Sequence, residues 1–85
     1  MFKELLDMYL GYFTAHGEKA IPVICNCKIP SDIVLMAYKK LPPIEDLPER
    51  EKKELKQYVI ETFPEKTVQE KLNCCKIIYT IGTLL

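Results

Sequence analysis

Hydrophobic residues recur with helical spacing at the start of the chain. The apolar positions at i, i+3, i+4, i+7 and i+11 are Phe2, Leu5, Leu6, Tyr9 and Phe13. This spacing places them on one face of an α-helix and predicts a helix over Phe2–His16. Gly17 follows directly and is expected to end the helix, because glycine readily takes the left-handed conformation found there.

The pattern of residues 18–30 is ambiguous. Ile21, Val23 and Ile24 favour extended structure, and the cysteines nearby are compatible with it. Pro22 and Pro30 prevent an uninterrupted helix. We therefore expect a buried extended crossing, flanked by prolines, with a short strand as an option.

Two helices are expected between residues 31 and 63. Ser31 is placed to cap the first, which would end near residue 40 before Pro42 and Pro43. Its inward positions would be Ile33, Met36, Ala37 and Leu41. The second would run from residue 48 to 63, with Asp46 and Glu49 as a capping box. Its inward positions would be Leu55, Tyr58, Val59 and Phe63.

Residues 68–85 are the most apolar part of the chain. Thr67 and Glu70 form a capping-box pattern that opens a helix, which we expect to reach about residue 80. The helix would carry two apolar stripes and be buried on two sides. One stripe comprises Val68, Leu72, Cys75 and Tyr79, and the other Cys74, Ile77, Ile78 and Ile81. A strand over residues 77–85 is the alternative, because β-branched residues are frequent there.

These elements predict an all-α fold in a single domain over residues 1–85. It would contain four helices, with the Pro-flanked crossing after the first. The alternative is an α+β fold with a two-stranded sheet made from residues 21–28 and 77–85. The 48% hydrophobic content is sufficient for a core.

The end of the last segment is apolar on nearly all sides. Its apolar residues are Ile77, Ile78, Tyr79, Ile81, Leu84 and Leu85. A domain this small covers one face of a helix, so we expect an exposed apolar patch that mediates self-association as a twofold homodimer. Alternatively, Leu84 and Leu85 fold back over the first helix and the chain is a monomer.

The charges argue against nucleic-acid binding. Twelve basic residues balance twelve acidic ones, and Arg50 is the only arginine. A helix-turn-helix built from residues 31–63 is the alternative, and its candidate phosphate contacts are Lys39, Lys40, Lys52, Lys53 and Lys56. Acidic residues are interleaved with these lysines, so a solvated mixed-charge face is the simpler interpretation.

Four cysteines and one histidine are the candidate metal ligands or disulfide partners: Cys25, Cys27, Cys74, Cys75 and His16. Zinc sites usually space their cysteines by two to four residues, whereas here one residue or none intervenes. Adjacent side chains on a helix point about 100° apart. We expect buried thiols, with a disulfide from Cys27 to Cys74 or Cys75, or a metal or redox site, as alternatives. No cofactor is expected.

The sequence contains no recognisable catalytic motif. It has no glycine-rich phosphate loop, and His16 lacks a recognisable partner motif, so we expect no enzyme activity. We recognise no signal peptide and no membrane-length apolar run, so we expect a cytoplasmic protein. The composition is compatible with a thermophile, and the small size with a viral source. We expect a protein that binds an unidentified protein as a regulator, inhibitor or assembly subunit.

Overall fold

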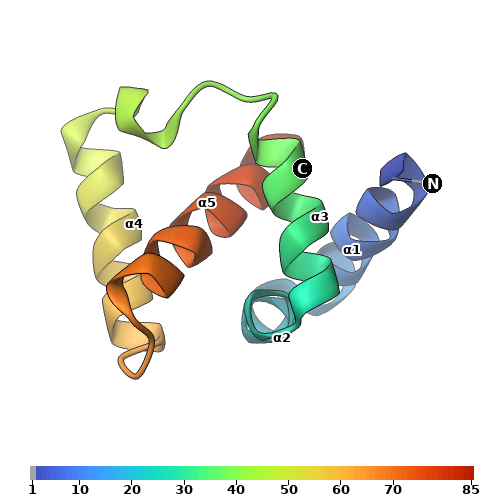
Figure 1. Ribbon diagram of the computed structural model, residues 1–85, viewed down its shortest axis with the longest axis horizontal. Helices are drawn as coiled ribbons and strands as arrows, with labels where there is room; N and C mark the ends of the chain where they lie inside the picture. The colour runs from blue at the N-terminus through green and yellow to red at the C-terminus, as the bar shows by residue number, and fades with distance from the viewer. Residues whose placement is uncertain (1) are drawn as a thin grey trace.

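The computed structural model describes residues 2–85, with side chains from Lys3 onward, and 83% of these residues are helical. Five α-helices and two 3-10 turns lie within this range and are arranged as Figure 1 shows. Their order is α1 (Phe2–His16), η1 (Gly17–Lys19), α2 (Ala20–Asn26), α3 (Lys28–Tyr38), η2 (Ile44–Asp46), α4 (Glu49–Thr62) and α5 (Val68–Leu84). The all-α prediction is confirmed. No strand occurs in the described range, so the α+β alternative is wrong.

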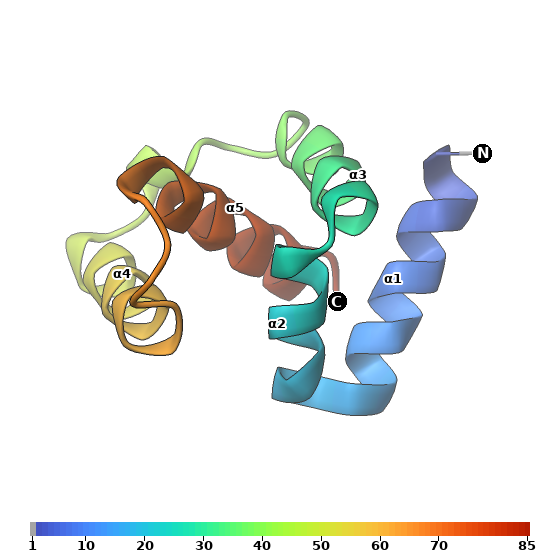
Figure 2. The same cartoon turned by 60° about the horizontal axis from the view of Figure 1, so that its bottom comes forward.

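Helix α1 has the predicted boundaries. Leu5, Leu6, Tyr9 and Phe13 are half-buried, as expected for an amphipathic surface helix, while the side chain of Phe2 lies outside the described side chains. Gly17 has a φ of 61°, in the left-handed region that glycine favours. The chain then turns through η1 into α2, which packs beside α1 (Figure 2).

The extended crossing predicted after the first helix is wrong. Residues 20–38 form α2 and α3, separated at Cys27, whose φ of −103° and ψ of 125° are extended. Pro22 and Pro30 each occupy the third position of a helix, within the first turn, where a backbone N–H has no intrahelical acceptor. Two prolines near helix starts therefore produce two short helices.

Ser31 is not the predicted N-cap, because α3 begins three residues earlier. Its hydroxyl instead donates to the Ile24 carbonyl oxygen at 2.7 Å and ties α3 to α2. The inward face of α3 is also shifted from the prediction. Val34 and Ala37 are buried, while Met36 is 50% exposed.

The capping box predicted from Asp46 and Glu49 is wrong. Asp46 lies in η2, and the N-cap position of α4 is Pro48, which has no side chain able to accept a hydrogen bond. The predicted inward face of α4 is confirmed toward its C-terminal end, since Val59 and Phe63 are buried. Leu55 and Tyr58 are half-buried against them.

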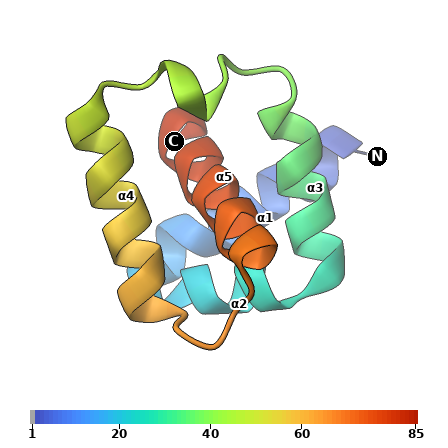
Figure 3. The ribbon, with the colours of Figure 1, turned by 60° about the vertical axis from the view of Figure 1, so that its left-hand side comes forward.

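The capping box of α5 is confirmed. The Thr67 hydroxyl accepts from the Glu70 N–H at 3.2 Å, and a Glu70 carboxylate oxygen accepts from the Thr67 N–H at 2.9 Å. The helix continues to Leu84, beyond the predicted residue 80. It runs through the middle of the fold, with α3 and α4 on either side (Figure 3), and contacts α1, α2, α3 and α4. This packing overrides the strand preference of residues 77–83.

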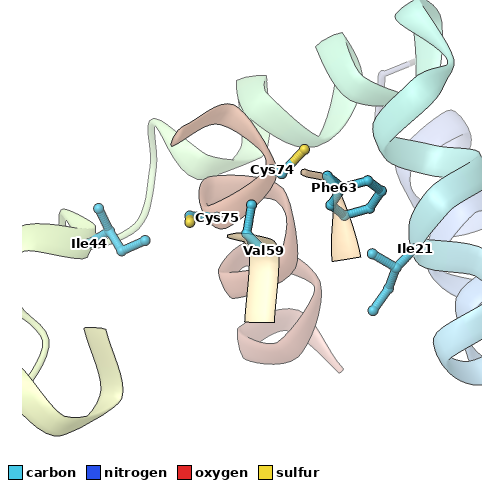
Figure 4. Packing of buried hydrophobic residues seen from close by; sticks show 6 residues of the cluster. All are labelled: Ile21, Ile44, Val59, Phe63, Cys74 and Cys75. Atoms are coloured by element: carbon cyan, nitrogen blue, oxygen red, sulfur yellow. The ribbon is translucent and has the colours of Figure 1, made fainter. Parts of the chain in front are cut away.

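The core consists of two clusters that meet along α5. The α4 cluster, shown in Figure 4, comprises Ile21, Ile44, Val59, Phe63, Cys74 and Cys75. The α2–α3 cluster comprises Ala20, Ile24, Val34, Ile77 and Ile81. The prediction that α5 is buried on two sides is correct, but Leu72 is 39% exposed and belongs to neither cluster.

No single described helix combines the length and hydropathy of a membrane span. Segments Lys3–Asn26 and Lys28–Tyr38 together meet the length and composition criteria, with a bend of 99° between them.

Candidate interaction site

An apolar groove lies between α4 and α5. Its volume is about 340 Å³, and it is lined by Lys56, Val59, Ile60, Val68, Lys71, Leu72 and Cys75. Val59 and Cys75 are buried members of the α4 cluster and form its floor. Its apolar walls are therefore continuous with the core.

Three side chains of the groove expose much of their apolar surface. Ile60 is 42% exposed, Leu72 39% and Val68 85%. Ile60 follows the buried Val59 on α4, and Val68 and Leu72 stand four residues apart on one face of α5. A cluster of exposed apolar side chains around a concave surface is typical of an interaction site.

The charge at this groove is positive. Lys56 and Lys71 are the charged residues among those that line it, and none of the lining residues carries a carboxylate. Lys56 is also close enough to lower the pKa of the Cys75 thiol, although burial is the larger effect and raises that pKa overall. A bound acidic group would meet a favourable field here.

The predicted C-terminal patch is divided by the fold. Ile77 and Ile81 are each 1% exposed and belong to the α2–α3 cluster, so a single chain already buries them. Ile78 and Tyr79 are half-buried. Leu84 and Leu85 remain exposed at 39% and 60%. The exposed apolar surface at this end is thus smaller than the sequence pattern indicates.

The predicted helix-turn-helix geometry is absent from α3 and α4. They are joined by residues 39–48, which include η2, whereas that motif uses a turn of about three to four residues. Lys39 and Lys40 follow α3 directly, while Lys52, Lys53 and Lys56 lie on α4. The Lys52 ammonium binds a Glu49 carboxylate oxygen at 2.8 Å and the Glu45 carbonyl oxygen at 3.3 Å. The Lys52 ammonium therefore already has partners within the chain, on a surface that also carries acidic residues.

The cysteines divide into a buried group and an exposed one. Cys25 is half-buried and packs against the α4 cluster, to which Cys74 and Cys75 belong, whereas Cys27 is exposed between α2 and α3. Burial is the main cause that raises the pKa of Cys25, Cys74 and Cys75. Cys25 is the cysteine of α2 that packs against this cluster, while Cys27, the residue of the disulfide alternative, is exposed.

The predicted metal ligands do not converge. His16 is exposed at the end of α1, and its ring lies 4.3 Å from the Tyr12 ring, centroid to centroid. Within residues 2–85, no group of three or more His, Cys, Asp or Glu side chains is arranged to hold a metal ion.

The α4–α5 groove was not identified from the sequence. The available signal was Ile60, an apolar residue off the inward stripe of an otherwise charged helix surface. The stripe pattern predicts burial of Val68 and Leu72, but both are exposed in the fold. Comparison with known proteins adds no further assignment, since no protein-family model, curated protein or solved structure matches this chain.

Proposed function

We propose that this chain is a protein-interaction module whose α4–α5 groove binds an amphipathic helix with acidic flanks. The observation that carries the proposal is the exposure of Ile60, Val68 and Leu72 around one apolar groove. Removing such side chains from water is favourable by about 25 cal/mol per Å² of apolar area. The module would act as a regulator, inhibitor or assembly subunit inside the cell.

The chemistry of the partner follows from the lining of the groove. An amphipathic helix places apolar side chains at i, i+3, i+4 and i+7 into such a groove. Acidic side chains beside these anchors would approach Lys56 and Lys71. Charge complementarity of this kind increases the association rate and sets the orientation of the bound helix.

A second copy of the chain is a poorer occupant of this groove. A twofold interface places the same surface on both sides, so Lys56 and Lys71 of two copies would approach one another. Like charges brought together in this way oppose association. Homodimerisation through Leu84 and Leu85 is a separate proposal, which light scattering tests.

The test uses a designed helical peptide as the probe. The peptide carries leucine at i, i+3, i+4 and i+7 and glutamate at the flanking positions, and its twin carries lysine in place of glutamate. Binding to the isotopically labelled chain is followed by NMR. We expect the glutamate peptide to shift signals from residues of α4 and α5 that line the groove, and to bind more tightly than the lysine peptide.

Leu72→Ser and Leu84→Ser form a matched pair of variants, because both leucines lie on α5 and are 39% exposed. We expect Leu72→Ser to weaken binding of the glutamate peptide by about tenfold or more, as for a central interface residue. Leu84→Ser should leave it unchanged. Equal effects of the two variants, or no binding of the glutamate peptide, would contradict the proposal. Light scattering of the unmodified chain and Leu84→Ser tests the homodimer separately.

A further inference from the structure

Cys25 and Cys74 lie side by side, although they are far apart in the sequence. Cys25 is on α2 and Cys74 on α5, two helices in direct contact. Both side chains line a pocket of about 180 Å³ that Lys28, Asp32, Lys66 and Glu70 also line. Each thiol is also close enough to change the pKa of the other. The fold therefore brings two oxidisable groups together beside a solvent-accessible pocket.

The other two cysteines are arranged differently. Cys27 is exposed at the break between α2 and α3. Cys75 follows Cys74 on α5, but its sulfur points to another side of the helix (Figure 4), toward the α4–α5 groove that it lines. Adjacent residues of an α-helix are expected to diverge in this way. The pairing of Cys25 with Cys74 is thus specified by the packing of α2 on α5.

We propose that Cys25 and Cys74 form an intramolecular disulfide when the folded protein meets a low-molecular-weight disulfide. The Cys25 thiolate attacks one sulfur of that oxidant, which forms a mixed disulfide and releases one small thiolate. The Cys74 thiolate then attacks the Cys25 sulfur and releases the second small thiolate. Two protein thiols lose two electrons and two protons, and one oxidant molecule becomes two small thiols.

The surroundings of the pair determine its rate of oxidation. Cys25 is the more exposed partner, so it is the entry point for the oxidant. Burial raises the pKa of both thiols and makes the reactive thiolates scarce. The Lys66 ammonium opposes this effect at both sulfurs. We expect slow oxidation that Lys66 accelerates, and slow reduction by an added thiol, because Cys74 is buried.

The disulfide would cross-link the two core clusters. Cys74 belongs to the α4 cluster, and α2 contributes Ala20 and Ile24 to the α2–α3 cluster. A bond between α2 and α5 restricts the unfolded chain over a long loop. We therefore expect the Tm to rise by more than about 5 °C on oxidation. This inference does not depend on the proposed binding function of the groove.

The experiment compares two double variants under oxidised glutathione at about pH 8.5, where thiolates are more abundant. The variant Cys27→Ser/Cys75→Ala retains Cys25 and Cys74. We expect it to lose the mass of two hydrogens and to yield a cross-link between tryptic peptides 20–28 and 72–76. The control Cys25→Ser/Cys75→Ala retains Cys27 and Cys74, one of the two disulfide alternatives that the sequence offers, and should yield a glutathione adduct on Cys27. Dithiothreitol should reverse both products.

Three outcomes would overturn the proposal. The first is a Cys27–Cys74 bond in the control, and the second is disulfide-linked dimers as the main product. The third is that Cys25 and Cys74 remain separate thiols or glutathione adducts in natively folded Cys27→Ser/Cys75→Ala. Circular dichroism verifies that each variant is folded. If Cys75→Ala unfolds the chain, the single variant Cys27→Ser is oxidised instead. Fragment ions then assign the bond to Cys74, as we propose, or to Cys75, which would refute it.

Discussion

The rings of Tyr38 and Tyr79 meet edge to face, with centroids 6.0 Å apart and planes at 77°. The contact joins α3 to α5, and both hydroxyls form hydrogen bonds with the backbone of the connection that follows α3. The Tyr38 hydroxyl accepts from the Ile44 N–H at 2.8 Å, and the Tyr79 hydroxyl donates to the Pro42 carbonyl oxygen at 3.2 Å. The two tyrosines therefore fix the path of the chain from α3 to α4.

Tyr38→Phe should destabilise the protein by about 0.5–1.5 kcal/mol, because it leaves the N–H of the buried Ile44 without this acceptor. Tyr79→Phe is the matched control. It removes a longer and more exposed hydrogen bond, so its cost should be smaller. Urea denaturation of both variants measures the difference. A larger loss for Tyr79→Phe would show that the Ile44 contact is not the dominant one.

Ile81→Ala and Leu72→Ala test the burial pattern of α5. Ile81 is 1% exposed in the α2–α3 cluster, and its truncation should cost about 2–5 kcal/mol of unfolding free energy. Leu72 is 39% exposed, so Leu72→Ala should cost less than about 1 kcal/mol. Thermal melts followed by circular dichroism would show the contrast. Similar costs at the two sites would mean that the groove is closed in solution.

Thr67→Ala removes the capping box of α5 and should cost about 0.5–2 kcal/mol. Thr62→Ala, at the exposed end of α4, is the control and should be nearly neutral.

The hydrogen bonds to Thr67 lower the pKa of the Glu70 carboxyl in the folded state. The ionised Glu70 carboxylate therefore stabilises the folded state above its ordinary pKa of 4.5, and this stabilisation is lost as the pH falls below that value. Glu70→Gln should reduce the loss of stability on acidification, as urea titrations at several pH values would measure.

The thiols should react at different rates. Cys27 is exposed and should react with a thiol reagent at once, whereas Cys25, Cys74 and Cys75 should react slowly until the chain is unfolded in urea. Four equally fast thiols in the native protein would contradict the packing described here.

The raised pKa values of the three slower thiols also predict an alkaline loss of stability. The folded chain keeps these protons above pH 9.0, the ordinary thiol pKa, while the unfolded chain loses them. Stability should therefore fall as the pH rises from 9.0 toward about 10, the start of the tyrosine and lysine range. Replacing Cys25 by Ser should reduce the slope. Urea denaturation across this range checks it.

Some single helix ends were predicted correctly from a local signal. Gly17 fixed the end of α1, and Thr67 with Glu70 fixed the start of α5. The wrong prediction of an extended crossing came from prolines, whose effect on a helix depends on their position in it. Pro22 and Pro30 end a helix when they are inside it but are compatible with its first turn. A segment with a proline and β-branched residues is compatible both with a strand and with a helix that begins just before the proline. Its sequence alone does not decide between them.

Exposure along α5 could not be predicted from its periodicity. The stripes indicated burial on two sides, which is correct for Ile77 and Ile81 but not for Leu72. Which turns of a central helix are covered depends on how far its neighbours extend. The α4–α5 groove and the pairing of Cys25 with Cys74 both depend on that packing, which no local pattern in the chain records.

The central position of α5 has a consequence for the order of folding. The helix contributes to both core clusters and contacts α1, α2, α3 and α4, yet it follows all of them in the sequence. During synthesis, the four preceding helices are therefore made before the helix that joins them. Until α5 is available, residues such as Ile24, Val34 and Val59 lack the partners that α5 supplies, and they present apolar surface to other proteins. Correct folding therefore awaits α5, and the nascent chain is open to chaperones until then.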